Sequence, residues 1–162
     1  MHAVIIGAGE LGVAVARRLI SAGHEMAVID LDRSRRDQLD EALGGVSVAG
    51  DGTEAAVLAR AGANRAEALI ATTGRDDVNL VACQLAKHRF GVARTIALVN
   101  VPEHSDLFDS LGVDVVVDAT ELALGRIQEG LSSHGMVHLM PVSESDEKAL
   151  VAVKIPLDTG GD

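Results

Sequence analysis

Short apolar runs alternate with stretches of helical periodicity along most of this chain. The runs contain Val, Ile, Ala and Leu in succession, without interleaved polar residues, which is typical of strands buried on both faces of a parallel sheet. Glycine-containing turns separate many of the runs. This pattern predicts strands at residues 2–6, 25–30, within 45–53, and at 66–72, 95–99 and 113–117.

Helices are predicted between these strands. In the first of them, Leu11, Val15 and Leu19 recur at helical spacing, and Gly23 follows as a stop signal. Further helices are predicted at residues 33–43, 54–61, 76–89, 107–111 and 121–131. The alternation of strand and helix predicts an α/β fold, with a Rossmann-like doubly wound sheet of six parallel strands.

The last part of the chain departs from this alternation. Residues 137–142 and 149–155 predict two strands, and the acidic segment SESDEK lies between them. We therefore expect a nucleotide-binding domain at residues 1–135. Residues 136–162 are expected to form a short C-terminal β extension, either an edge hairpin or the incomplete start of a second lobe.

The segment IIGAGELG joins the first predicted strand to the first predicted helix. Gly7 permits a tight turn, Gly9 lets the backbone approach a phosphate without an intervening Cβ, and Gly12 lets the helix pack close to the sheet. Free N–H groups at the helix N-terminus would then face the anion. Glycines also end strands for structural reasons alone, so the motif needs support from other residues.

An acidic residue at the end of the second strand provides that support. Asp30 closes the run EMAVID. In a dinucleotide-binding fold, a carboxylate at this place accepts hydrogen bonds from the hydroxyls of the adenosine ribose, and its charge opposes a 2′-phosphate. The alternative is that Asp30 only begins a turn or caps the next helix.

Two other strand ends carry polar and small residues. Asp51 and Gly52 follow the third strand, and Thr72, Thr73 and Gly74 follow the fourth. In open parallel sheets ligands bind at the carboxyl ends of the strands, where these residues would lie. Asp51 could contact an adenine, but a capping role for Asp51 or Thr53 is an equally good interpretation.

Composition narrows the function classes. The 162 residues suit one domain with a full core, and only 1% of them are aromatic, which argues against a base-stacking nucleic-acid platform. The net charge of -10 repels nucleic acid and anionic lipid. Cys83 is the only cysteine, so no internal disulfide can form. No apolar run is long enough to span a bilayer, so we expect a soluble protein.

An enzyme is the rival interpretation. A Rossmann dehydrogenase needs a general acid or base near the nicotinamide. His104 follows the fifth strand, but a surface histidine at a helix start explains it better. His134 and His138 have no evident third ligand, so no metal site is expected. Arg33 would favour NADP, which the carboxylate of Asp30 opposes.

Several motifs taken together resemble a known family. In chain order they are IIGAGELG, AVIDLD, AGDGT, ALIATTGRDDVNLVACQLAK, IALVNVPEH and LGVDVVVD. They closely resemble the N-terminal nucleotide-binding lobe of RCK domains, also called KTN or TrkA-N domains. The resemblance covers about residues 1–131, and ATTGRDDVNLVACQLAK with VPEH is far more specific than the glycine loop. EKALVAVKIPLD resembles the opening strand of the family's C-terminal lobe.

This resemblance implies a function. RCK domains are cytoplasmic regulatory subunits of Trk- and Ktr-type potassium uptake systems, and related domains gate potassium channels. They bind NAD(H), ATP, ADP or AMP, and the ligand shifts the arrangement of dimers within a ring beneath the membrane protein. No catalytic residue is implied. An NAD-dependent oxidoreductase of unknown substrate is the alternative.

The resemblance also assigns the ligand contacts. The glycine loop would hold the phosphates, Asp30 the adenosine ribose, Asp51 and Gly52 the adenine end, and the loop after the fourth strand a phosphate or the second ribose. The full set of expected contact residues is Gly7, Ala8, Gly9, Glu10, Leu11, Gly12, Asp30, Leu31, Asp51, Gly52, Thr72, Thr73 and Gly74.

Three departures from the family's pattern bear on the ligand. ATP-responsive members carry a basic residue where this chain has Glu10, and a Lys or Arg where it has Leu98. Family members often have a glutamate after the sixth strand, whereas this chain has Thr120 at that position and Glu121 one position later. A carboxylate beside a polyphosphate is unfavourable. We therefore favour NAD(H), with AMP or ADP next, over ATP.

The resemblance further implies the partners. We expect a membrane-embedded potassium transporter or channel subunit and a homodimer or higher ring, with no nucleic acid and no direct membrane insertion. The predicted location is the cytoplasm, at the inner face of the plasma membrane through that partner. The apolar spacing of residues 122–131 suits a dimer contact, although packing on the chain's own sheet would explain it equally well.

Overall fold

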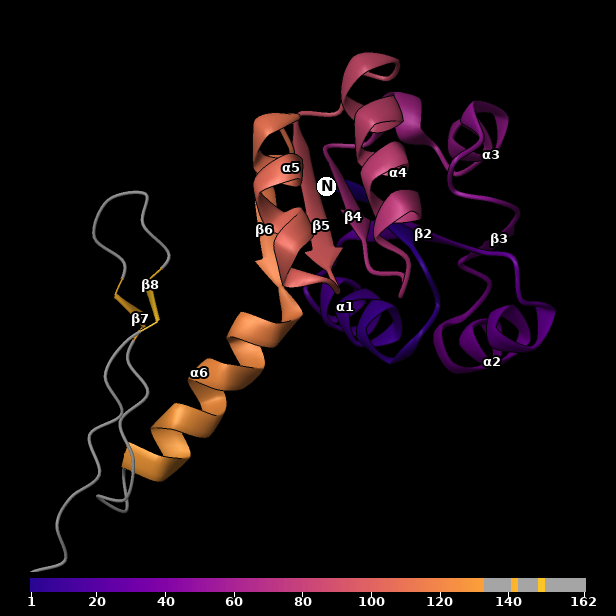
Figure 1. The fold of residues 1–162 in the computed structure, drawn as a ribbon. Helices are drawn as coiled ribbons and strands as arrows, with labels where there is room; N and C mark the ends of the chain where they lie inside the picture. The colour runs from indigo at the N-terminus through magenta and orange to yellow at the C-terminus, as the bar shows by residue number, and fades with distance from the viewer. Residues whose placement is uncertain (133–140, 143–148, 151–162) are drawn as a thin grey trace, which may run out of the picture. The chain divides into compact units, whose positions relative to one another are not determined.

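The computed structural model describes residues 1–132, 141–142 and 149–150. Its centre is a six-stranded parallel sheet with the order β3-β2-β1-β4-β5-β6 (Figure 1). The strands are β1 (His2–Ile6), β2 (Glu25–Asp30), β3 (Ser47–Ala49), β4 (Ala68–Ala71), β5 (Arg94–Val99) and β6 (Val115–Asp118). The predicted Rossmann-like α/β fold is confirmed.

The two halves of the sheet meet at β1. It pairs with β2 through Ile6 and Ile29 and with β4 through Ile6 and Ala71, so the strand order reverses beside β1. In open α/β sheets, a ligand crevice forms at the carboxyl ends of strands where the order reverses. The fold therefore directs attention to the segments that follow β1, β2 and β4.

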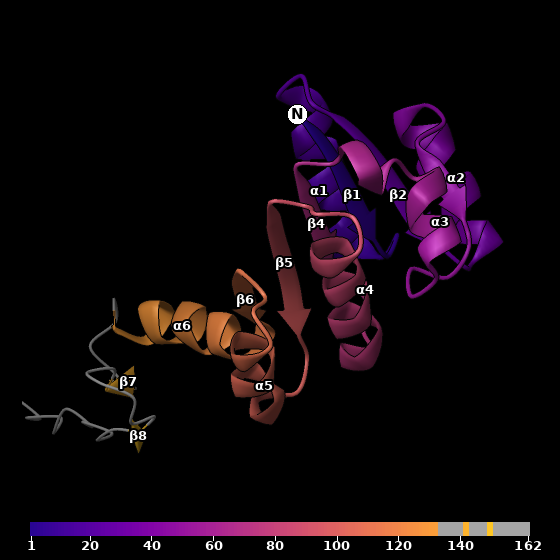
Figure 2. The same cartoon turned by 90° about the horizontal axis from the view of Figure 1, so that it is seen from above.

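Helices cover both faces of the sheet (Figures 1 and 2). On one face, α1 (Glu10–Ser21) and α2 (Arg33–Leu43) pack on Ile5 and Val28. On the other face, α3 (Ala55–Arg60), α4 (Asp76–His88) and α5 (Ser105–Ser110) contribute to a core cluster that also contains Val4 and Ile6 of β1. All five residues of β1 are buried, which accounts for its uninterrupted apolar sequence.

Short helical turns are the main difference from the predicted elements. The 3₁₀ turns η1 (Ala63–Arg65) and η2 (Pro102–His104) precede β4 and α5. The second turn exists because Pro102, whose fixed φ suits a first helical position, starts the helical geometry five residues earlier than predicted. Strand β6 begins two residues later than expected, after Asp114 has bonded to Thr95 on β5.

The chain divides into two compact units, Met1–Ala119 and Thr120–Asp162. Helix α6 (Ala119–Ser132) begins at the end of the first unit. In the second unit, β7 (Pro141–Val142) pairs antiparallel with β8 (Ala149–Leu150). These two strands lie within the predicted C-terminal β segments, whose other residues lie outside the described ones. The domain boundary at residue 135 stays a prediction.

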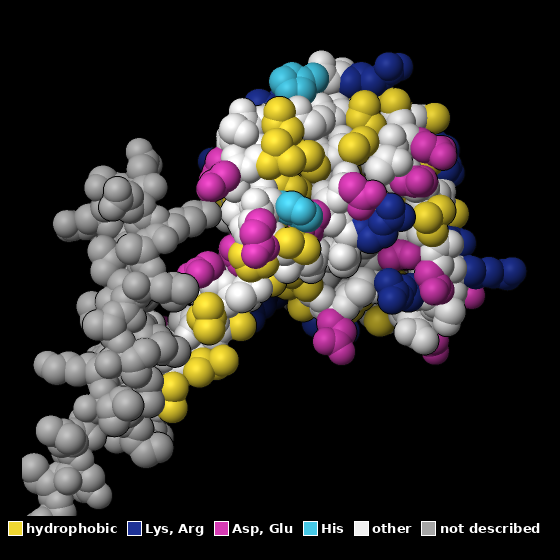
Figure 3. All heavy atoms as spheres, viewed as in Figure 1, with side chains coloured by type: hydrophobic (Ala, Val, Ile, Leu, Met, Phe, Trp, Pro, Cys, Tyr) yellow, Lys and Arg dark blue, Asp and Glu magenta, His cyan; other side chains and the backbone are white. Residues whose placement is uncertain are grey.

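Two surface properties follow from the described residues. None of the helices they form is long and apolar enough to cross a membrane. On the face shown in Figure 3, acidic and basic side chains are interspersed over this part of the chain, without a basic stripe. Such a stripe is the electrostatic signature of nucleic-acid binding.

Gly12 fixes the distance between α1 and β1. A Cβ at this position would overlap the carbonyl oxygen of Gly7 and lie 2.9 Å from Oγ1 of Thr72. The obstacle is backbone, which a rotamer change cannot remove. The requirement for glycine therefore comes from helix-to-strand packing, as its place in the motif predicts.

Gly12→Ala should lower the free energy of unfolding by about 2–3 kcal/mol, because the added methyl group overpacks the β1 to α1 turn. Urea unfolding measures the change. Gly125→Ala on α6 is the matched control, since a Cβ there meets nothing within 4 Å, and it should be neutral or stabilising. Equal stability of Gly12→Ala and the wild-type chain would contradict this account of the turn.

Candidate functional site

The segments after β1, β2 and β4 meet at one edge of the sheet. Thr72 donates its backbone N–H and its hydroxyl to the carbonyl of Ile6, at 2.9 and 3.0 Å. The space beside Gly7 is occupied by Thr72 and Thr73, which lie 3.1–3.3 Å from a Cβ built there. The glycine loop and the predicted Thr72, Thr73 and Gly74 segment are therefore in direct contact.

The N-terminus of α1 is open at this edge. Gly9 is the N-cap residue, and no side chain caps the helix. Because the first N–H groups of a helix have no partner within it, the amides of the first turn point outward as donors. A Cβ at Gly9 or at Gly74 would meet nothing within 4 Å. These two glycines therefore border open space, which suits close approach of a phosphate.

Asp30 links the glycine loop to the end of β2. Its Oδ2 accepts the N–H of Ala8 at 2.7 Å, and its Oδ1 accepts the N–H of Asp32 at 2.7 Å. A carboxylate has about four acceptor sites, so two backbone bonds leave capacity for two ribose hydroxyls. The alternative was that Asp30 only begins a turn or caps the next helix. Asp30 does begin a turn, because its side chain accepts the N–H of Asp32. The residue that caps α2 is Asp32, through Arg35.

Leu31 is the most exposed large apolar residue on the segment after β2, with 70% of its surface accessible. Arg36 holds this segment by donating to the carbonyls of Asp30 and Leu31, both at 2.9 Å. An apolar side chain presented beside a fixed carboxylate can cover one face of an adenine ring. Arg36 was not anticipated from the sequence.

Asp51 is turned toward its own loop. Its Oδ1 accepts the N–H and the hydroxyl of Thr53, at 2.8 and 2.7 Å, and these bonds hold the pKa of Asp51 below its ordinary value. The residue at the N-cap of α3 is Glu54, so neither Asp51 nor Thr53 caps that helix. Gly52 lies over Ile6, with a Cβ position 2.5 Å from its Cγ2. Contact of Asp51 and Gly52 with an adenine stays a prediction.

Asn79 organises the segment after β4, and sequence reasoning missed it. It is fully buried, and its Oδ1 accepts the N–H and hydroxyl of Thr73 at 3.1 and 2.6 Å. Its Nδ2 donates to the carbonyls of Thr73 and Leu98, both at 2.9 Å. A polar residue in the apolar run of α4 was the available signal, because a buried amide requires partners.

Asp76 makes a second cross-link at the same edge. It is 9% exposed, and it accepts hydrogen bonds from the backbone of Asn100 at 2.7 Å, the backbone of Val101 at 3.0 Å and Nδ1 of His104 at 2.8 Å. Burial raises the pKa of Asp76, but the hydrogen bonds from Asn100, His104 and Val101 outweigh it and leave the pKa below its ordinary value. The carboxylate therefore joins α4 to the end of β5.

The two residues that bear on ATP lie on different elements. Glu10 is exposed in the first turn of α1, and Leu98 is half-buried in β5. Arg75, a basic residue on the segment after β4, contributes to the lowered pKa of Asp51. Arg75 also pairs with Asp77 at 2.6 Å, which reduces the positive charge available to a polyphosphate.

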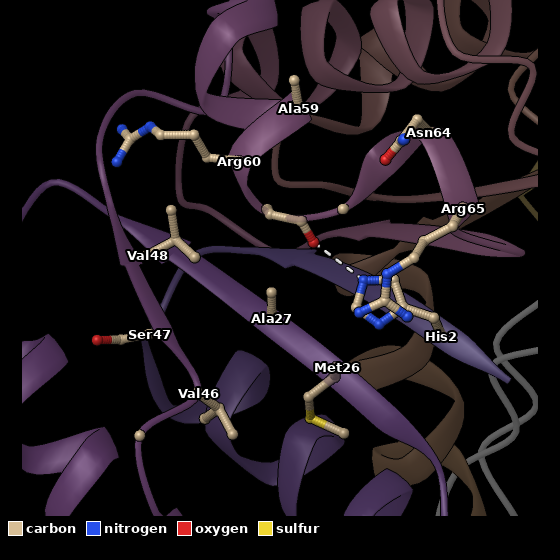
Figure 4. A pocket seen from close by; sticks show the side chains of 13 residues that line it. His2, Met26, Ala27, Val46, Ser47, Val48, Ala59, Arg60, Asn64 and Arg65 are labelled. Carbon is tan, nitrogen blue, oxygen red and sulfur yellow. Dashed lines mark hydrogen bonds between the residues drawn. The ribbon is translucent and has the colours of Figure 1, made fainter.

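A cavity of about 460 Å³ lies elsewhere, at the amino-terminal ends of β2 and β3 (Figure 4). Ala27 and Val48 line it from the sheet, and Arg60 and Arg65 line it from α3 and η1. His2 borders it and bonds through Nε2 to the carbonyl of Ala61 at 2.9 Å. None of the predicted contact residues lines this cavity.

Of the three candidate histidines, His104 alone lies within the residues that the structure describes. Nδ1 of His104 is bonded to Asp76, as described above. His134 and His138 lie outside the described residues. In the part of the chain that the structure describes, no three His, Cys, Asp or Glu side chains group as a metal site. Burial raises the pKa of the Cys83 thiol to about 12, which makes it unreactive.

Asp76→Asn should lower the free energy of unfolding by roughly 1–3 kcal/mol at pH 7, because one amide hydrogen would face the N–H of Val101. The folded-state pKa lies below the unfolded value of about 3.9, so the stabilisation is present above that value. It is lost as the pH falls through the folded-state pKa. Urea unfolding at pH 7 and near pH 3 measures the difference.

Asp77→Asn is the matched control, since Asp77 is the exposed neighbour in the same turn of α4. It should change stability little at either pH. A loss from Asp76→Asn that is the same at both pH values would mean that the carboxylate charge is not what stabilises this edge.

The TrkA-N domain family matches residues 3–119. The Trk system potassium uptake protein TrkA homolog of Pyrococcus abyssi is 35% identical over 152 residues, which cover 91% of this chain and 67% of that protein.

Solved structures agree with this relationship. The GsuK channel bound to NAD is 29% identical, with a TM-score of 0.69, and the match covers 78% of this chain and 23% of that chain. GsuK bound to ADP has the same identity and TM-score, with coverage of 83% and 34%. The family match includes all six strands except the first residue of β1, together with the glycine loop, Asp30 and the Thr72 to Gly74 segment. The chain therefore belongs to the TrkA-N domain family.

Proposed function

We propose that this chain is the nucleotide-binding regulatory domain of a Trk- or Ktr-type potassium uptake system. It binds an adenosine nucleotide at the carboxyl edge of the sheet and responds by a change of conformation. One observation carries the proposal: the N-terminus of α1 has no side-chain cap and is open at Gly9, beside a carboxylate held by the N–H of Ala8.

The ligand contacts divide by chemistry. Amides of residues 9–12 hold phosphate oxygens, and Asp30 accepts the adenosine ribose hydroxyls. Leu31, Asp51 and Gly52 border the adenine, while Thr72, Thr73 and Gly74 border the second phosphate or ribose. Support comes from the contacts that bring these segments together and from the relative GsuK, which has been solved with NAD and with ADP.

NAD(H) is the favoured ligand, with ADP or AMP next. Glu10 is exposed in the first turn of α1, where a γ-phosphate would meet its negative charge, and Arg75 is already paired with Asp77. NAD carries no terminal phosphate, so its pyrophosphate needs only the helix N-terminus. The carboxylate of Asp30 disfavours the 2′-phosphate of NADP.

The proposed role is regulatory and not catalytic. A dehydrogenase would need a general acid or base beside the nicotinamide. His104 lies at this edge, and its Nδ1 is bonded to the Asp76 carboxylate. The relative from Pyrococcus abyssi is a potassium uptake protein, which supports regulation.

The proposed partners are a membrane-embedded potassium transporter and a second copy of this chain. Helix α6 offers the contact between copies, because Leu122 and Ile127 are 60% and 54% exposed. Apolar side chains exposed along one helix are typical of an interaction surface. The domain would then act in the cytoplasm, attached to the membrane through the transporter.

Thermal unfolding with a panel of nucleotides tests the proposal. NADH and ADP, each at about 100 times its Kd, should stabilise the chain by about 2.7 kcal/mol. ATP at the same concentration as ADP should stabilise the chain less. Asp30→Ala should abolish most of the effect, because the ribose loses its acceptor and the glycine loop loses its tie to β2.

Asp37→Ala, an exposed carboxylate on α2, is the matched control and should keep the wild-type response. An unfolding temperature that none of the nucleotides raises would contradict the proposal. Steady NADH oxidation with a small substrate would instead favour the oxidoreductase alternative.

A further inference from the structure

A series of hydrogen bonds, joined through the adjacent residues His104 and Ser105, runs from the proposed nucleotide edge to Asp118, the residue before α6. It begins at the carbonyl oxygen of Thr73, which accepts a hydrogen bond from Nδ2 of Asn100 at 3.0 Å. The backbone N–H and the Nδ2 of Asn100 both donate to Oδ1 of Asp76, at 2.7 and 2.9 Å. The end of β5 is thus fixed to the segment that borders the ligand.

The second oxygen of Asp76 continues the series. Oδ2 accepts the N–H of Val101 at 3.0 Å and Nδ1 of His104 at 2.8 Å. An ionised carboxylate only accepts hydrogen bonds, so Nδ1 of His104 carries the proton. Asp76 is buried and accepts hydrogen bonds from four donors, on Asn100 and Val101 after β5 and on His104 of η2, so it ties α4 to both elements.

Ser105 completes the series. It follows His104 directly, is 6% exposed, and donates its hydroxyl to Oδ2 of Asp118 at 3.1 Å. Asp118 is the last residue of β6, and α6 begins at the next residue, Ala119. The boundary between the two compact units of the chain also falls here, after Ala119.

We propose that His104 and Ser105 are positioning residues that couple the nucleotide edge to the start of α6. A nucleotide that contacts the Thr73 segment further restrains Asn100 and Asp76, and through them the η2 to α5 junction that holds Asp118. Binding therefore stabilises the first turns of α6. The inference rests on the proposed function, because it takes the nucleotide to be the ligand at this edge.

Amide hydrogen exchange over residues 119–132 tests the coupling in the 162-residue chain, without ligand and with saturating NADH or ADP. In the wild type, the nucleotide should slow exchange in the first turns of α6 by about fivefold, the lower end of measured couplings between sites. In His104→Ala and Ser105→Ala most of this slowing should be lost, while the Kd for the nucleotide changes by less than about threefold.

Two further variants separate coupling from general damage. His104→Asn should restore the slowing, because its side-chain N–H can replace Nδ1 as the donor to Asp76. Glu103→Ala, at the exposed neighbouring position of η2, should behave as the wild type. Loss of the slowing in Glu103→Ala as well would show that any change in η2 has this effect, and would overturn the assignment to His104.

The outcomes distinguish the two proposals. If neither nucleotide binds the wild-type chain, the proposed function fails. If a nucleotide binds but exchange in α6 does not slow, or slows equally in both alanine variants, the coupling through His104 and Ser105 is overturned while nucleotide binding stands.

Discussion

The hydrogen bond between the N–H of Ala8 and the carboxylate of Asp30, 2.7 Å long, is the interaction on which the site depends. It joins the segment after β1 to the end of β2, so the proposed phosphate-binding and ribose-binding parts are connected before any ligand binds. The same carboxylate also accepts a hydrogen bond from the N–H of Asp32, which is the N-cap residue of α2, so the start of α2 is held as well. An unrestrained Asp30 side chain would lose conformational entropy when the ligand binds, which would weaken binding. The hydrogen-bonded side chain is already ordered, so it avoids this loss.

The other half of the edge is fixed by buried polar side chains. Asn79 holds Thr73 and the end of β5, while Asp76 holds Asn100, Val101 and His104. Because buried amides and carboxylates are costly unless every polar atom is paired, these networks specify one arrangement of the strand ends. Together the two halves border the space beside Gly9 and Gly74.

Sequence patterns predicted the sheet and the glycine loop well, since uninterrupted apolar runs and the spacing of Gly7, Gly9 and Gly12 follow directly from burial and packing. They did not predict that Asp76 and Asn79 would be buried, because short-range patterns do not show which helix turn faces a strand end. The turn of Asp51 toward Thr53 was equally hidden, since a local side-chain bond competes with a ligand contact. The pattern also predicted strands at residues 137–142 and 149–155, and only their assignment to the family's C-terminal lobe rested on the resemblance.

The central claim is that an adenosine nucleotide occupies the space between the first turn of α1 and Asp30. Amide chemical shifts of the isotope-labelled chain, followed during titration with NADH, test it most directly. The account predicts that the largest shifts fall on Gly9, Leu11, Gly12 and Gly74. Shifts that cluster instead around His2, Arg60 and Arg65, at the cavity of the opposite edge, would contradict it.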